Sequence, residues 1–495
     1  MKRLKLIVLS LFLVLLTLNQ SILANGILYS HSDMTWVAGS NTKEASYVVG
    51  SSGVEDPSYT PSARAMAYTW KDLDSDYLYL FGGGRYNYYD INTRKSDLWR
   101  FNVTSGSWAY LWGFLDENYN GNYNSLNGDV FPGSRYGGAS WPAANHSFYL
   151  FGGNGYGGLS YTTYTNDLWY FNGTTNKWSW LGGLHPDSFT EYDPKAVYGT
   201  KGEFGSSNRP GGRTYPAHWR DNEGNLWLFG GIGFTDQAGS GILNDMWVYN
   251  VTLGQWAWIS GNRTTTNNPV YGEQGIFASD NTPGKGHSYY TWVDANGNFW
   301  LFGGRENQLF NELWCFNTTL RQWAFISSLG AQNTAGNYGT KDLSASTNHP
   351  GSRYGGTSWT DSEGRLWLFG GNSFDKYVIN DFWYYDISTG WWTWSAGSSD
   401  GSVDTVHGTI DVYSVDNVLG FRLYHSSWIT STGTVYVFGG QYMGYTKQHY
   451  NDMWRVVLTP PALDEFNNVL GAIIFTISSL SVIGIIITKN RIFKL

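Results

Sequence analysis

Short runs of aromatic and β-branched residues alternate with Gly, Asn, Asp and Ser along most of the chain, and they recur in sets of four. The second run of each set ends in two glycines, as in "RLWLFGG" at residues 365–371, and it occurs six times. A run that ends in tryptophan precedes it, an "NDLW"-like run follows it, and an aromatic-rich run closes the set. Runs of this composition between turn residues predict β-strands, which we call a, b, c and d in chain order.

The positions of the runs are regular. Strand a is predicted at 64–70, 135–141, 213–219, 286–292, 353–359 and 422–428. Strand b is predicted at 77–83, 148–153, 225–231, 298–304, 365–371 and 435–440. Strand c is predicted at 96–102, 166–172, 244–250, 311–317, 380–386 and 451–457. Strand d follows strand c in the first five sets and is absent from the sixth.

The missing strand d has a candidate at the other end of the chain. The segment "MTWVAGS" at 34–40 stands alone before the first set and matches the strand d sequence "QWAWISG" at 255–261. We therefore expect it to complete the last sheet and to close a ring. A closed ring of four-stranded sheets is a β-propeller, which hides the strand edges that an open array would expose. The prediction is an all-β, six-bladed propeller.

The double-glycine strand, the Asn-Asp aromatic strand and the tryptophan strand together resemble the kelch repeat. The resemblance covers residues 34–457 and implies a kelch-type propeller similar to that of galactose-oxidase-like proteins. The repeats are nearer 70 residues than the 50 or so of kelch repeats, and the surplus lies mainly between strands d and a. All 26 tryptophans fall in predicted strands, so we expect them in the core rather than in a ligand cage. The glycine pairs predict positive φ or close backbone contact at the end of strand b.

Arginine and aspartate also recur at fixed places. Arginine opens strand a in five repeats, at Arg64, Arg135, Arg213, Arg353 and Arg422. Aspartate opens strand c in the same five, at Asp97, Asp167, Asp245, Asp381 and Asp452. The fourth repeat has Gly286 and Glu312 instead. Both positions fall at the same end of a blade, so we expect structural ion pairs. The alternative is that the arginines form an anion- or ligand-facing ring at the mouth of the channel.

Both termini carry targeting patterns. Residues 1–24 have basic residues, an apolar stretch and a terminal alanine, which predicts a secretory signal peptide rather than a buried helix. Residues 469–488 are uncharged, and their length of about 30 Å as a helix predicts a transmembrane span. The basic tail at 489–495 predicts the cytoplasmic side. We expect a single-pass type I membrane protein with the propeller (25–458) extracellular or lumenal and a tether at 459–468.

Composition excludes some classes of function. The net charge of −8 argues against nucleic acid as a partner. Cys315 is the single cysteine, so no intramolecular disulfide forms, and its place inside strand c indicates a buried thiol rather than the crosslink of a copper-radical oxidase. His218, His287 and His425 stand at different heights in strand a and make a poor metal triad. No catalytic site, cofactor or metal is predicted.

Six Asn-X-Ser/Thr sequons predict a glycoprotein, with Asn used as a turn residue as the alternative: Asn102, Asn145, Asn172, Asn250, Asn262 and Asn317. Five of these lie in the short a–b and c–d turns on one face. The long d–a connections, such as 184–212 and 113–134, emerge on the other face, and long loops are often functional. We therefore predict an extracellular binding or adhesion module that recognises a protein or glycan through the d–a loops. The alternative is a metal-independent sugar-modifying enzyme of mutarotase type.

Overall fold

The computed structural model describes residues 32–86, 91–124, 128–156, 163–184, 194–237, 239–265, 268–443 and 447–458. In these ranges the chain forms strands and connecting segments without a helix, so none that could cross a bilayer is found there. The predicted signal peptide, tether, membrane span and tail lie outside the described residues.

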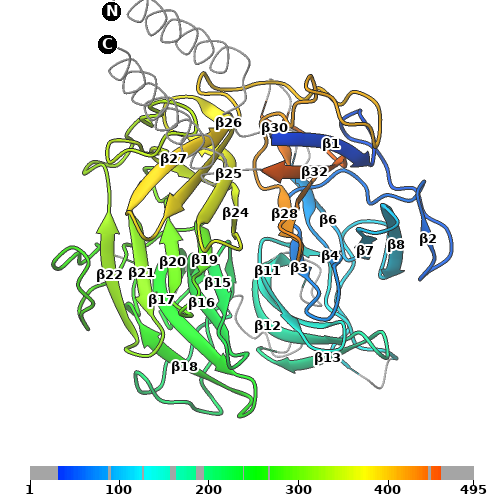
Figure 1. The fold of residues 1–495 in the computed structure, drawn as a ribbon. Coiled ribbons are helices and arrows are strands. Elements are labelled where there is room, and N and C mark those ends of the chain that lie inside the picture. The colour runs from blue at the N-terminus through cyan, green and yellow to red at the C-terminus, as the bar shows by residue number, and fades with distance from the viewer. Residues whose placement is uncertain are drawn as a thin grey trace, which may run out of the picture. The chain divides into compact units, whose positions relative to one another are not determined.

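Six antiparallel sheets form the body of the described chain, as predicted (Figure 1). Blade one consists of β3 (Tyr68–Lys71), β4 (Tyr77–Phe81), β7 (Leu98–Asn102) and β8 (Ser107–Trp112), with β2 (Glu55–Asp56) at its outer edge. Blade two consists of β9 (Arg135–Tyr136), β10 (Ala139–Ala143), β11 (Ser147–Gly155), β12 (Thr163–Asn172) and β13 (Lys177–Gly182). Blade three consists of β14 (Arg213–Thr214), β15 (Ala217–Arg220), β16 (Leu226–Phe234), β17 (Ser240–Asn250) and β18 (Gln255–Ser260).

The second half of the ring repeats the same order. Blade four consists of β19 (Tyr290–Val293), β20 (Phe299–Phe302), β21 (Leu313–Asn317) and β22 (Gln322–Ser327). Blade five consists of β23 (Arg353–Tyr354), β24 (Thr357–Thr360), β25 (Leu366–Ser373), β26 (Tyr377–Asp386) and β27 (Trp391–Ala396). Blade six consists of β28 (Ser426–Ile429), β29 (Val435–Phe438), β32 (Met453–Leu458) and β1 (Ser32–Ala38). Two b–c hairpins add β5 (Gly84–Tyr86) with β6 (Ile91–Arg94), and β30 (Gln441–Met443) with β31 (Lys447–His449).

Blade six confirms the predicted closure. The N-terminal strand β1 is hydrogen-bonded beside β32, the last strand of the described chain, and Figure 1 shows the dark blue and orange-red arrows side by side. Beyond the strand, the amide of Ser40 donates to the Asn451 side chain at 3.1 Å. The Asn417 side chain donates to the carbonyl of Met34 at 2.9 Å. The ring is therefore closed by segments from both ends of residues 33–457, which form one compact unit.

The hydrophobic core lies between neighbouring blades rather than in one central mass. One cluster joins blade three to blade four, with Trp219 and Phe229 packed against Phe299 and Trp323. Equivalent clusters join blade one to blade two, blade two to blade three and blade four to blade five. Another joins blade six to blade one through Phe438 and Trp108. The strand c tryptophans are fully buried, as expected of core residues: Trp99, Trp169, Trp247, Trp314, Trp383 and Trp454.

The glycine pairs at the end of strand b have the backbone conformation that the sequence predicts. All twelve glycines have positive φ, between 62° and 98°. In blade one, a Cβ on Gly82 would stand 2.7 Å from the carbonyl oxygen of Arg135 in the next blade. The amide of Gly83 donates to that same carbonyl at 2.9 Å. The pairs therefore let adjacent blades approach within backbone hydrogen-bonding distance, which a side chain would prevent.

The long d–a connections lie against the outer strand of the blade that they precede, and we call these segments edge straps. In the strap at 261–285, Ala278 forms a β-bridge with Trp323 of β22. Gly205 with Trp256, Ala345 with Trp392, and β2 with β8 repeat the arrangement in blades three, five and one. Unpaired edge strands invite association with other chains. The straps that precede these four blades therefore cover their outer edges.

Candidate functional site

A closed ring of backbone hydrogen bonds surrounds the axis of the propeller. Each blade contributes the residue that lies two positions after the arginine or its equivalent: Met66, Gly137, Tyr215, Ser288, Gly355 and Tyr424. The amide of each donates to the carbonyl of the ring residue in the preceding blade, at 2.5–3.2 Å, all the way round. All six have positive φ, four of them without being glycine. This axial ring confirms the closure at the innermost layer.

Side chains fill the centre of the axial ring. The rings of Tyr215 and Tyr424 stack with centroids 5.3 Å apart, although they come from opposite halves of the propeller. The hydroxyl of Tyr215 donates to the sulfur of Met66 at 2.9 Å. Cavities of about 350 Å³ and about 180 Å³ both have these three residues in their walls, and they lie on opposite sides of the axial ring.

The larger space, which we call the tyrosine cavity, opens on the face where the b–c hairpins and d–a straps begin and end. Its walls include four tyrosines, two arginines and two methionines: Tyr136, Tyr215, Tyr354, Tyr424, Arg85, Arg305, Met66 and Met443. Every blade contributes at least one wall residue. Its volume of about 350 Å³ falls within the range of small-ligand sites.

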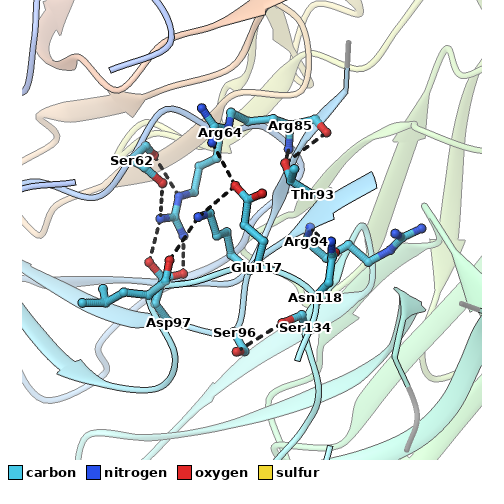
Figure 2. Close-up of polar contacts among 12 residues, drawn as sticks. Ser62, Arg64, Arg85, Thr93, Arg94, Ser96, Asp97, Glu117, Asn118 and Ser134 are labelled. Atoms are coloured by element: carbon cyan, nitrogen blue, oxygen red, sulfur yellow. Dashed lines mark hydrogen bonds and ion pairs between the residues drawn. The ribbon is translucent and has the colours of Figure 1, made fainter. Parts of the chain in front are cut away.

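The two arginines of the tyrosine cavity have different surroundings. Arg85 donates to Glu117 at 2.8 Å (Figure 2). It also lies 3.4 Å from Glu44, so two carboxylates hold it. Burial opposes a charge there, but the hydrogen bond to Glu117 and the attraction of both carboxylates raise the pKa of Arg85. Arg305 instead stacks on Tyr354, 5.0 Å from the ring centroid, and donates to its hydroxyl at 3.1 Å. Among the described residues Arg305 has no carboxylate partner, so its charge is available to a ligand.

The tyrosines present neutral donors and flat rings. Burial and the neighbouring hydroxyl groups raise the pKa of Tyr215 well above its ordinary value. Burial, followed by the nearby Tyr354 hydroxyl, likewise raises the pKa of Tyr424. Both hydroxyls therefore stay protonated at physiological pH. The cavity combines hydrogen-bond donors, aromatic faces and a guanidinium group, which suits a ligand rich in hydroxyl or acidic oxygens.

The five predicted arginines do not line the tyrosine cavity. Each is buried and forms a bidentate ion pair with the aspartate of its own blade, and Figure 2 shows the pair of blade one. The shortest distances are 2.6–2.9 Å for Arg64–Asp97, Arg135–Asp167, Arg213–Asp245, Arg353–Asp381 and Arg422–Asp452. The predicted pairing is confirmed, and the anion-binding ring stays a prediction.

Each aspartate also receives donors that the spacing does not reveal. The Nε1–H of the tryptophan two residues later donates to Asp167 at 2.6 Å, and a strap residue, Tyr123, donates to it at 2.5 Å. Burial opposes the charge on Asp167, but the Arg135 guanidinium and these hydrogen bonds hold the pKa of its carboxyl below the usual range. Tyr198 and Tyr338 repeat the strap contact, and His407 takes the same place beside Asp452.

The predicted cysteine and the sequon asparagines have structural roles or exposed positions. Cys315 is buried in β21, and burial raises the pKa of its thiol, so the sulfur is protonated. Four sequon asparagines end strand c: Asn102, Asn172, Asn250 and Asn317. Their side-chain oxygens accept backbone amides of the following turn, as Asn172 does from Thr174 at 2.9 Å. Asn145 and Asn262 are exposed. These contacts show the turn role, and glycosylation stays a prediction.

His218 lies in β15, whereas His287 and His425 precede β19 and β28, and none of them joins a group of potential metal ligands in the described chain. Burial lowers the pKa of His218 to about 4, and burial with the nearby Arg305 lowers that of His287 to about 4. A different set, Asp72, Asp74 and His146, places its ligand atoms within 4.8 Å of one another at two short turns. His146 is hydrogen-bonded to Asp72 at 2.6 Å there.

His349 gives a pH-dependent prediction. It is buried against Phe302 and Trp392, and its Nδ1 accepts the amide of Gly351 at 3.0 Å. Burial and the nearby Arg353 lower the pKa of its imidazole to about 3, against about 6.5 in an unfolded chain. The unfolded state therefore binds the proton first as the pH falls below about 6.5.

We expect acid to destabilise the wild-type protein more than it destabilises a His349→Phe variant. Between pH 6.5 and 4, the wild type should lose about 2–3 kcal/mol of unfolding free energy relative to the variant. Denaturant unfolding at both pH values measures the difference, and the other histidines cancel because both proteins contain them. An equal acid dependence in the two proteins would show that His349 does not stay neutral.

The axial ring and the tyrosine cavity are absent from the sequence prediction. One signal was available, because every ring residue lies two positions after the arginine or its equivalent. Arg85 and Arg305 also follow the glycine pairs of blades one and four.

No known protein family matches the chain. No curated protein matches it either.

Proposed function

We propose that the protein is a membrane-anchored, extracellular or lumenal kelch-type binding module, whose ligand is a protein or glycan. The β-propeller fold is consistent with a binding module. The observation that carries the proposal is the tyrosine cavity at the centre of the face that bears the strap connections. The signal-peptide and transmembrane patterns of the sequence support the location.

The cavity indicates how a ligand would be held. Arg305 supplies a guanidinium group without a carboxylate partner in the described chain, and Tyr354 positions it by stacking and by a hydrogen bond. Tyr136 adds a further aromatic wall. An acidic or hydroxyl-rich group that enters the cavity can pair with Arg305 and stack on the tyrosines, while the outer face contacts the rest of the ligand.

The experiment is a binding screen with residues 25–460 on an array of neutral and acidic glycans and on cell surfaces. Once a ligand is found, Arg305→Ala should weaken its binding at least about tenfold, because the guanidinium contact with the ligand is lost. Arg321→Ala, in a c–d turn on the opposite face, is the control and should leave affinity unchanged. Binding that survives Arg305→Ala and Tyr354→Ala at full strength would contradict the proposal.

The same protein tests the enzymatic alternative. Faster anomer exchange of a reducing sugar, abolished by Tyr354→Phe, would support the mutarotase-type enzyme instead of a pure binding module.

A further inference from the structure

Blade four differs from the other five blades where the ion pair should lie. Its strand a has Gly286 in place of arginine, and its strand c has Glu312 in place of aspartate. The other five blades show what a guanidinium group does in this setting. Arg213, for example, binds both oxygens of Asp245 at 2.7 and 2.8 Å and donates to the carbonyl of Gly230 at 3.0 Å.

The acceptors of this arrangement remain in blade four. Glu312 still accepts the Nε1–H of Trp314 at 3.0 Å and the hydroxyl of the strap residue Tyr271. Among the described residues, no cation pairs with Glu312. Gly303 stands where Gly230 stands in blade three, and no described residue donates to its carbonyl. A carboxylate and a carbonyl that bind a guanidinium elsewhere are thus present without one.

A cavity of about 50 Å³ adjoins these acceptors. Glu306 and Glu312 both line it, and the one lysine in its wall, Lys285, lies 2.8 Å from Glu306. Aromatic rings form the other walls: Tyr289, Phe310 and Trp314. Burial and then the charges of Glu312 and Glu306 raise the pKa of the Tyr289 hydroxyl, which is consistent with an excess of negative charge.

We infer that this blade-four cavity binds a guanidinium group supplied from outside the chain, with Glu312 and the Gly303 carbonyl as its acceptors. The aromatic walls favour a flat, delocalised cation over a hydrated ammonium group. The group can come from an arginine side chain of a partner polypeptide or from a small guanidino compound. The inference does not depend on the tyrosine cavity or on the proposed function.

Calorimetric titration of the full-length protein with methylguanidinium tests the inference. We expect the wild type to bind methylguanidinium saturably with a Kd below about 10 mM. Glu312→Gln should bind it at least about tenfold more weakly. Glu273→Gln removes an exposed carboxylate from the edge strap of blade four, which also carries Tyr271. This variant is the matched control and should bind methylguanidinium as the wild type does. Sodium chloride at equal ionic strength should not compete.

A second variant fills the cavity from within. Gly286→Arg combined with Tyr289→Gly restores the blade-five residue types at both positions, because a Cβ on Gly286 alone would stand 2.2 Å from the Tyr289 hydroxyl. We expect this variant to unfold at a higher temperature and to bind no methylguanidinium. Absence of binding to the wild type, or equal binding to all variants, would overturn the inference.

Two further ligands distinguish the source of the guanidinium. N-acetyl-arginine amide and short peptides with a central arginine are titrated in parallel. At least about tenfold tighter binding of a peptide indicates a polypeptide partner, and equal binding indicates a small guanidino compound.

Discussion

Replacement of Arg135 by methionine is expected to lower the free energy of unfolding by about 3–5 kcal/mol in the absence of any ligand. Arg135 binds both oxygens of Asp167 and donates to the carbonyl of Gly152. Without the guanidinium, Asp167 remains a buried carboxylate with only neutral donors, from Trp169 and Tyr123. Denaturant unfolding of the two proteins at pH 7 measures the loss.

Lys177→Met is the matched control. Lys177 pairs with Asp129 at 3.1 Å, but the two side chains are 65% and 71% exposed. Water screens such a pair, so we expect a change of no more than about 1 kcal/mol. If Arg135→Met were as stable as this control, the buried pairs would not hold the blades, and the anion-binding ring would regain support.

The second large effect is expected at the closure of the ring. Gly39 follows β1 with a φ of 83°, and a Cβ there would stand 2.0 Å from the carbonyl oxygen of Asn451. Gly39→Ala must therefore push β1 away from β32. We expect a loss of about 3 kcal/mol or more, as for other severe steric conflicts in a packed structure.

Gly53→Ala separates the clash from the backbone strain. Gly53 has nearly the same φ, 80°, and a Cβ there would have nothing within 4 Å. Strain alone costs about 1 kcal/mol at such a position. Thermal unfolding of both variants gives the difference, and equal losses would show that the closure is not under steric constraint.

Local composition predicted the strands and their ring because each strand carries its own pattern. Aromatic and β-branched runs mark the blades, and the isolated "MTWVAGS" marks the strand that the last blade lacks. The Arg–Asp pairs were predictable for the same reason, since both residues recur at fixed places in one blade.

The edge straps were harder to predict, because their partners lie in a strand reached only after the next three strands. The described parts of the straps cover blade edges, which the sequence analysis does not predict, and their role as a ligand-binding surface stays a prediction. They contain a signal of their own. A glycine and an asparagine nine residues later recur at Gly199 and Asn208, Gly272 and Asn281, Gly339 and Asn348, and Gly408 and Asn417. In each pair the glycine has positive φ and the asparagine side chain lies against it.

The tyrosine cavity could not be predicted from any one repeat. Arg305 and Tyr354 belong to different blades, and they meet only because the ring brings every inner strand to one axis. The departures of blade four were visible in the sequence, whereas the space beside Glu312 depends on how Tyr289 and Phe310 pack.

The pairing of β1 with β32 also sets a condition on biosynthesis. Ser40 and Asn451, which bond at the closure, are 411 residues apart, and ribosomes add about 5–20 residues per second. Strand β1 must therefore wait ~20–80 s for its partner β32. During that delay the apolar side chains of β1 lack the blade-six residues that they pack against, so we expect chaperones to occupy this segment until synthesis of the last blade is complete.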